Sequence, residues 1–135
     1  LKNNEFVAYS MAVQNGVDCI MVSHISADGV TGDDTPSSLS SVMISDVLRN
    51  TLGFDGVVMT DFLDDSAITD SYSSAEAAVA AIQAGADLLL SPEDYQEAYE
   101  GVLQAVADGT ISQERIHDSI YRIYRVKYKN AIDTQ

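Results

Sequence analysis

Short apolar runs alternate with longer amphipathic segments along this chain. Three of the runs share one plan, in which a Gly-x-Asp turn leads into the run and a polar residue follows it; these turns begin at Gly16, Gly53 and Gly85. The runs are too short for helices and are bounded by turn residues, so they indicate buried strands. The predicted strands cover about residues 18–23, 56–60 and 87–90.

Helical periodicity fills the segments between these runs. Ser73 and Glu76 form the Ser-x-x-Glu pattern of a capping box, and Gly85 stands where that helix would end. The predicted helices cover about residues 5–15, 41–52, 73–84, 91–109 and 112–129. Strands that each need a helical crossover are parallel, and their near-continuous apolar runs fit burial on both faces. The chain therefore predicts an α/β fold in one domain.

The charge composition of the chain limits the kinds of molecule that it is expected to bind. The 135 residues carry 21 carboxylates against seven Lys and Arg, a net charge of −14. Nucleic acids and anionic membrane surfaces attract basic patches, so we expect neither as a partner. The sequence also shows no signal peptide and no apolar run of membrane length. The single cysteine, Cys19, cannot form an internal disulfide and is expected to be a small buried residue in the first strand.

Two polar residues follow predicted strands at the same edge of the sheet. Asp61 ends the second strand and His24 ends the first. In α/β proteins, ligands bind at the carboxyl ends of parallel strands. Asp61 there can act as a nucleophile, base, metal ligand or phosphoacceptor, or it can simply cap a turn or helix. His24 can equally contact a ligand or make a structural hydrogen bond.

The remaining polar and aromatic residues give little indication of a catalytic or metal-binding role. Aspartates crowd the loops 26–38 and 61–72, but their spacing does not match a calcium-binding loop. No zinc-ligand spacing or phosphate-binding loop is present, so we expect a solvated acidic surface and no metal. His117 is interpreted as a surface or packing residue. Five tyrosines at helical spacing are expected to pack inward: Tyr95, Tyr99, Tyr121, Tyr124 and Tyr128.

A longer motif surrounds Asp61. It comprises Leu52-Gly53-Phe54-Asp55-Gly56-Val57-Val58-Met59-Thr60-Asp61-Phe62-Leu63, with Pro36-Ser37-Ser38 before it and Ala84-Gly85-Ala86-Asp87 after it. In these segments, and over nearly its whole length, the chain resembles glycoside hydrolase family 3. No Trp follows Asp61, and a His stands at position 24. Both features are closer to the bacterial β-N-acetylhexosaminidase branch than to the β-glucosidase branch.

The resemblance implies a role for each candidate. Asp61 would be the nucleophile of a retaining glycosidase, forming a covalent glycosyl-enzyme that water then hydrolyses. His24 would line the sugar pocket, the substrate would be a carbohydrate, and no cofactor would be needed. Asp65 stands where the branch usually has Met, so it either alters substrate choice or faces solvent. Another specificity of the family, β-glucosidase or β-xylosidase, remains open.

The resemblance covers only part of a barrel. A complete (β/α)8 barrel takes about 250 residues, whereas this chain has three predicted strands. Residues 1–135 are thus expected to be the C-terminal portion of the catalytic domain. The general acid/base, a His–Asp dyad on an upstream loop, would lie outside the chain. The fragment is expected to be inactive alone and to self-associate or pair with the missing half. Both a cytoplasmic and an exported bacterial protein remain open.

Two other classes of protein share some of these features. A signalling receiver domain has similar length and a phosphoacceptor Asp at a strand end. It needs an acidic pair after its first strand and a lysine at that edge, but the lysines here are Lys2, Lys127 and Lys129, all near the chain ends. A non-catalytic sugar-binding or structural remnant is the other reading. It predicts that replacing Asp61 in the full-length protein leaves turnover unchanged.

Overall fold

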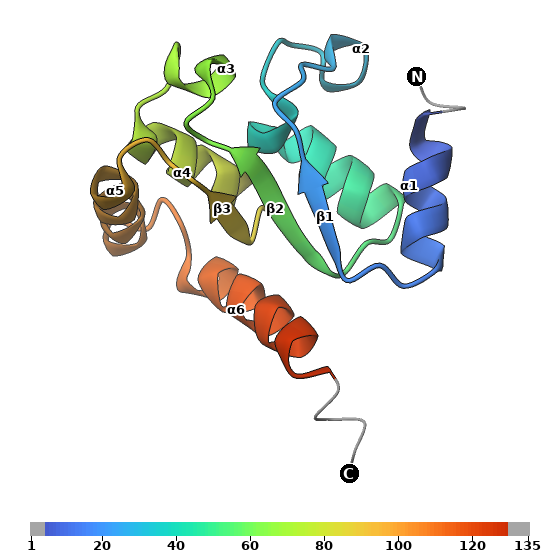
Figure 1. Cartoon of the computed structure of the whole chain (residues 1–135). Coiled ribbons are helices and arrows are strands. Elements are labelled where there is room, and N and C mark those ends of the chain that lie inside the picture. Colours follow the sequence, from blue (N-terminus) through green and yellow to red (C-terminus); the bar gives the residue numbers. More distant parts are fainter. Residues whose placement is uncertain (1–4, 130–135) are drawn as a thin grey trace.

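Three parallel strands form the centre of the computed structural model, which describes residues 5–129 (Figure 1). Strands β1 (Cys19–Val22), β2 (Val57–Phe62) and β3 (Leu88–Leu90) lie in the order β1-β2-β3. Cys19 pairs with Val57 in the β1–β2 register, whereas the β2–β3 register is irregular between Met59 and Phe62. The predicted α/β class with three parallel strands is confirmed.

Helices connect and flank these strands. They are α1 (Glu5–Gln14), α2 (Asp28–Thr31), the 3-10 turn η1 (Ser37–Leu39), the π-helix η2 (Val42–Thr51), α3 (Ser66–Thr69), α4 (Ser74–Ala84), α5 (Tyr95–Ala107) and α6 (Gln113–Lys127). Each predicted helix is present. The second has wider turns than expected: the N–H of Leu52 donates to the carbonyl of Val47 at 2.9 Å, five residues earlier. Both predicted loops contain short helices.

The boundaries of α4 follow from its sequence. The Ser73 hydroxyl accepts from the Glu76 N–H at 3.2 Å, and the Glu76 carboxylate accepts from the Ser73 N–H at 2.8 Å. This is the predicted capping box. Gly85 ends the helix with a φ of 118°, and a Cβ there would lie 2.9 Å from the Cγ2 of Ile44. The turn into β3 thus needs glycine for both its backbone angle and its space.

The hydrophobic core lies on one face of the sheet, beneath η2 and α4 (Figure 1). Ile44 from η2, Val58 from β2 and Ala81 from α4 are fully buried there. Side chains alternate along strands, so Met59 points to the opposite face. On that face Met21 is 52% exposed and Leu88 is 37% exposed, whereas Val57 at the start of β2 is buried. The sheet therefore has one closed face and a second, apolar face that is open around Met21 and Leu88.

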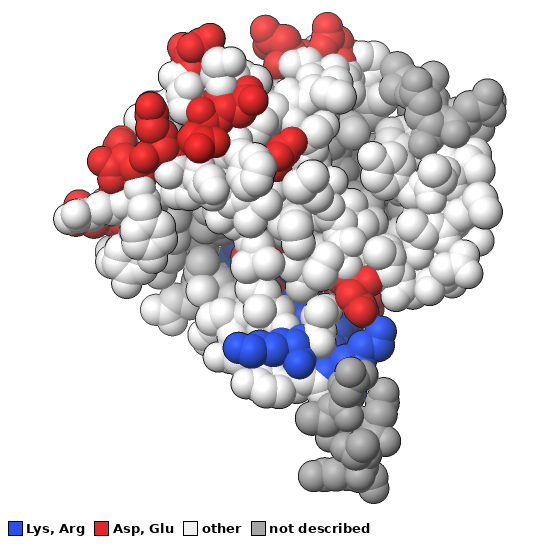
Figure 2. Space-filling model, viewed as in Figure 1, with Lys and Arg blue, Asp and Glu red and all other residues white. Residues whose placement is uncertain are grey.

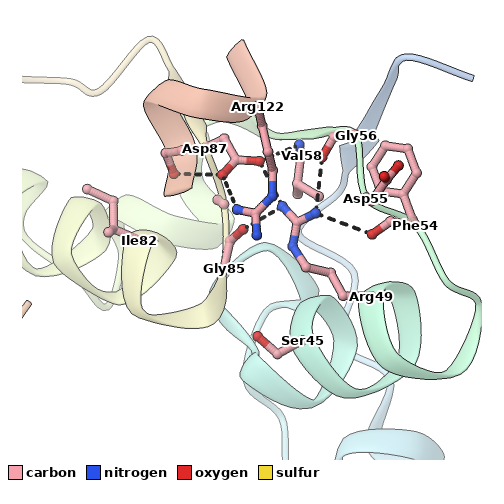
Figure 3. A network of polar contacts seen from close by, with 12 residues as sticks. Ser45, Arg49, Phe54, Asp55, Gly56, Val58, Ile82, Gly85, Asp87 and Arg122 are labelled. Atoms are coloured by element: carbon pink, nitrogen blue, oxygen red, sulfur yellow. Dashed lines mark hydrogen bonds and ion pairs between the residues drawn. The ribbon is translucent and has the colours of Figure 1, made fainter. Parts of the chain in front are cut away.

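The buried carboxylate of Asp87 bonds to residues from several helices and strands. The Asp87 side chain, just before β3, has no exposed area, and it lies 2.7 Å from Arg49 of η2 and 3.0 Å from Arg122 of α6 (Figure 3). Arg115 of α6 is 3.7 Å away, and the N–H of Val58 donates to the same carboxylate at 3.0 Å. Burial lowers the pKa of Arg49 and Arg115, and the Asp87 charge opposes that shift. One carboxylate thus joins η2, α6, β2 and the start of β3.

This carboxylate also decides which face of α6 points inward. Arg115, Ser119 and Arg122 share one side of the helix, and the Ser119 hydroxyl donates to Asp87 at 2.6 Å. Arg115 also donates to the carbonyls of Ile82 at 2.9 Å and Ala86 at 2.6 Å. The polar side of α6 therefore packs against the protein.

The prediction that the tyrosines pack inward is wrong. Their exposed fractions lie between 48% and 74% for Tyr95, Tyr99, Tyr121, Tyr124 and Tyr128. Ile120, which was expected in the apolar stripe of α6, is also exposed. Four of them stack in pairs instead, with ring centroids 6.3 Å apart for Tyr95 and Tyr99 and 5.7 Å apart for Tyr124 and Tyr128. On α6 the cause is Asp87, because the arginines that pair with it occupy the inward face.

We predict that Asp87→Asn lowers the free energy of unfolding by about 3–5 kcal/mol, because it leaves buried guanidinium groups without their counter-charge. Urea denaturation of the 135-residue chain measures this. Asp55→Asn is a matched control: Asp55 also pairs with an α6 arginine, Arg125 at 3.2 Å, but its side chain is 85% exposed. That change should cost less than about 1 kcal/mol. Equal losses in the two variants would contradict the central role of Asp87.

We also predict that Gly101→Ala destabilises the chain, although this change usually stabilises a helix interior by about 0.5–1 kcal/mol. Gly101 lies where α5 meets α4, and a Cβ there would be 2.6 Å from the Cβ and 3.0 Å from the Cα of Ala75. Forcing the helices apart should cost about 1–3 kcal/mol. Thermal unfolding gives the sign, and an increase in Tm would refute the close helix contact.

Candidate functional site

Asp61 lies next to the last residue of β2, the central strand. It alternates with the buried Thr60 and so shares the open face of the sheet with Met59. Its Oδ1 accepts a hydrogen bond from the N–H of Phe62 at 2.9 Å. Within residues 5–129, Oδ2 accepts no hydrogen bond. The side chain is half-buried, so one carboxylate oxygen is anchored and the other is available to a ligand.

Thr60 explains why Asp61 faces this way. The Thr60 hydroxyl accepts from the N–H of Leu90 at 3.1 Å, in place of a backbone partner at the irregular step between β2 and β3. The N–H of Leu63 donates to the carbonyl of Leu90 at 2.8 Å beyond it. Because Thr60 is held on the closed face, strand alternation directs Asp61 to the open one.

His24 is joined to the same strand end. Its Nε2 lies 2.8 Å from the carbonyl oxygen of Phe62, and its Nδ1 lies 2.7 Å from the Oγ of Ser38. A carbonyl oxygen only accepts, so Nε2 carries a hydrogen and donates to it. In the neutral ring, Nδ1 then accepts from the Ser38 hydroxyl. The structure thus brings the two predicted site residues together, with Phe62 as their common neighbour.

Ser38 belongs to the segment predicted as a loop, which turns back onto the end of β1. The N–H of Ser38 donates to the carbonyl of Ser23 at 3.1 Å, and the Ser37 hydroxyl donates to the carbonyl of Ile25 at 2.5 Å. Ser37, Ser38 and Ser40 are all buried. Ser38 was not among the predicted site residues, although Pro36-Ser37-Ser38 was part of the family motif.

Acidic side chains surround this end of the sheet. Figure 2 shows Asp and Glu gathered along the edge that carries α2 and α3, whereas Lys and Arg lie at the opposite end. Asp65 has a structural role: its Oδ1 accepts from the N–H of Ala67 at 2.8 Å and caps α3. Across the described part of the chain, no three His, Cys, Asp or Glu side chains converge as metal ligands.

The other candidates lie elsewhere. Cys19, at the start of β1, is half-buried, and burial together with the neighbouring Asp18 raises the pKa of its thiol. His117 is exposed on α6, as a surface residue. None of the helices in residues 5–129 has the length and apolar character needed to cross a membrane.

An apolar cavity elsewhere in the described chain does not contain Asp61. Its volume is about 380 Å³, and it lies between α1, β1 and η2, with Phe6, Met21 and Val47 among its lining residues. Asp61 instead stands on the open face of the sheet.

A carboxylate at the carboxyl end of parallel strands is a feature of the active sites of enzymes built on β/α barrels. Residues 1–126 match the family model described as the glycosyl hydrolase family 3 N terminal domain. The chain belongs to glycosyl hydrolase family 3, which confirms the family suggested by the sequence motif.

Known proteins agree with this membership. A solved family 3 beta-N-acetylglucosaminidase from Paenibacillus sp. str. FPU-7 is 41% identical with a TM-score of 0.86, over 93% of this chain and 24% of that one. A Cellulomonas fimi protein named beta-N-acetylglucosaminidase/beta-glucosidase is 28% identical over 90% of this chain and 23% of its own length. A beta-hexosaminidase from Hydrogenovibrio crunogenus is 32% identical over 77% of this chain and 29% of its own length. The chain thus spans less than a third of these relatives.

Proposed function

We propose that these residues form part of a retaining glycoside hydrolase that removes terminal β-linked N-acetylhexosamine, with Asp61 as its nucleophile. The observation that carries this proposal is the carboxylate itself. It ends the central strand on the open face, with Oδ1 anchored to Phe62 and no hydrogen bond to Oδ2 from residues 5–129. The names of the relatives from Paenibacillus and Hydrogenovibrio support N-acetylhexosamine as the substrate class.

The chemistry proceeds in two displacements. An oxygen of Asp61 forms a bond to the anomeric carbon while the glycosidic C–O bond breaks, and the leaving oxygen takes a proton from a general acid. Water then attacks the same carbon, its proton passes to the conjugate base, and the Asp61 carboxylate is released. Two inversions give overall retention.

The general acid is proposed to come from outside residues 1–135. His24 is the imidazole beside Asp61 in the described chain, and both of its nitrogens are already hydrogen-bonded to Ser38 and Phe62. The coverage of less than a third of each relative supports the same view. Residues 1–135 are thus proposed to be the C-terminal portion of a family 3 catalytic domain.

β-Glucosidase activity is the second candidate, favoured by the double name of the Cellulomonas fimi relative. Aryl β-N-acetylglucosaminide and aryl β-glucoside, assayed side by side on the full-length protein, separate the two. We expect the larger kcat/KM for the N-acetylated substrate. A larger value for the glucoside would transfer the proposal to a glucosidase while leaving the role of Asp61 intact.

We predict that Asp61→Ala in the full-length protein lowers kcat by about 10³-fold or more, since the covalent intermediate can no longer form. Added azide should restore turnover by taking the place of the carboxylate and yield an α-glycosyl azide, detectable by NMR. Asp64→Ala, which removes an exposed carboxylate three residues further on, is the control and should keep wild-type activity. Unchanged turnover in Asp61→Ala would favour the non-catalytic remnant.

The isolated 135-residue chain is expected to self-associate and to lack hydrolase activity. Met21 and Leu88 expose apolar area on the open face, and β1 and β3 are sheet edges within residues 5–129. Light scattering at micromolar concentration should show dimers or larger species. Changing Met21 to Lys should shift the population toward monomer. A monomeric wild-type chain under these conditions would contradict the prediction.

A further inference from the structure

His24 contacts the backbone that carries the proposed nucleophile, and it does so with its polar atoms. We infer that His24 is a positioning residue, which aims the Asp61 carboxylate by holding Phe62, and does not use a nitrogen to bind sugar. This inference rests on the proposed function of Asp61. The geometry supporting it is a hydrogen-bonded chain from Ser38 through His24 to Phe62 and Asp61.

Both backbone polar groups of Phe62 take part. Its carbonyl accepts from His24 Nε2 at 2.8 Å and from the N–H of Asp65 at the longer distance of 3.2 Å, and its own N–H donates to Asp61 Oδ1 at 2.9 Å. The Phe62 side chain is 55% exposed, so packing of the ring does little to fix this residue. The orientation of Phe62 therefore depends on hydrogen bonds, and the direction of Asp61 depends on Phe62.

The other side of the imidazole is equally constrained. Ser38 has no exposed area, and its backbone N–H is bonded to Ser23. Its hydroxyl meets Nδ1 at 2.7 Å, which leaves Nε2–H directed at Phe62. With both nitrogens occupied, the ring can line a sugar pocket only through its carbon atoms. The geometry also assigns Oδ2 of Asp61 as the attacking oxygen, since Oδ1 is held by Phe62.

The test uses the full-length enzyme and separates kcat from KM. His24→Ala should lower kcat by about 10–100-fold, the usual result of a slightly misplaced reacting group, while KM changes less than about threefold. His24→Gln keeps an amide N–H near the position of Nε2 and should recover most of the loss. Ser38→Ala leaves Nε2–H in place and should have a smaller effect than His24→Ala.

Several outcomes would overturn the inference. A raised KM with unchanged kcat in His24→Ala would identify His24 as a sugar ligand. Loss of the alkaline or acidic limb of the pH profile would identify it as an acid or base, because a positioning residue leaves those limbs in place. Failure of His24→Gln to recover activity, with the variant folded by circular dichroism, would show that the Phe62 hydrogen bond is not what matters.

The matched control is the other histidine, His117, which is exposed on α6. His117→Ala should retain wild-type kcat and KM. Failure of this inference is distinguishable from failure of the proposed function. If Asp61→Ala abolishes turnover but His24→Ala does not alter kcat, the nucleophile stands and the positioning role falls. If Asp61→Ala is fully active, the proposed function falls first.

Discussion

The fold depends on one buried carboxylate. Asp87 is removed from water, which costs several kcal/mol for an ion in a protein interior, and three arginines with a hydroxyl and a backbone N–H compensate it. Arg49 extends the connection by donating to the carbonyls of Gly56 at 3.0 Å and Gly85 at 3.1 Å. Removing the carboxylate would thus loosen two helices and two strands together, because each is attached to the same point.

The same constraint reaches the candidate site along β2. Asp87 bonds Val58 twice, through its side chain to the N–H and through its own N–H to the Val58 carbonyl at 2.8 Å. Asp61 lies three residues further along, where Thr60 and His24 hold the other end of the strand. Because these hydrogen bonds hold β2 at both ends, the strand has little freedom to shift its register. The direction of the Asp61 carboxylate therefore depends on hydrogen bonds made elsewhere along β2, by Asp87, Thr60 and His24.

Sequence reasoning located the strands and α4 well because their signals are local: glycine turns, short apolar runs and a capping box. Sequence reasoning failed where contacts between residues far apart in the sequence determine the structure. Asp87 was identified only as part of a repeated turn and of the family motif. Neither signal indicated that it would draw the polar face of α6 inward and leave Tyr124 exposed. The contact of His24 with Ser38 joins residues 14 positions apart across a folded-back loop. Hydrophobic periodicity shows that a helix has two faces, but tertiary partners choose between them.

Charge is divided along the axis of the sheet in a way that suits the proposed chemistry. The basic residues within 5–129 lie on η2, on α6 or just after it: Arg49, Arg115, Arg122, Arg125, Lys127 and Lys129. Carboxylates gather at the opposite end, along the edge that carries α2 and α3, without a Lys or Arg among them in the described chain (Figure 2). Glycosidic cleavage passes through an oxocarbenium-like transition state, and fixed charges act where charge develops. A negative field at Asp61 has the sign that stabilises this cation, and keeping the arginines at the Asp87 end preserves that field.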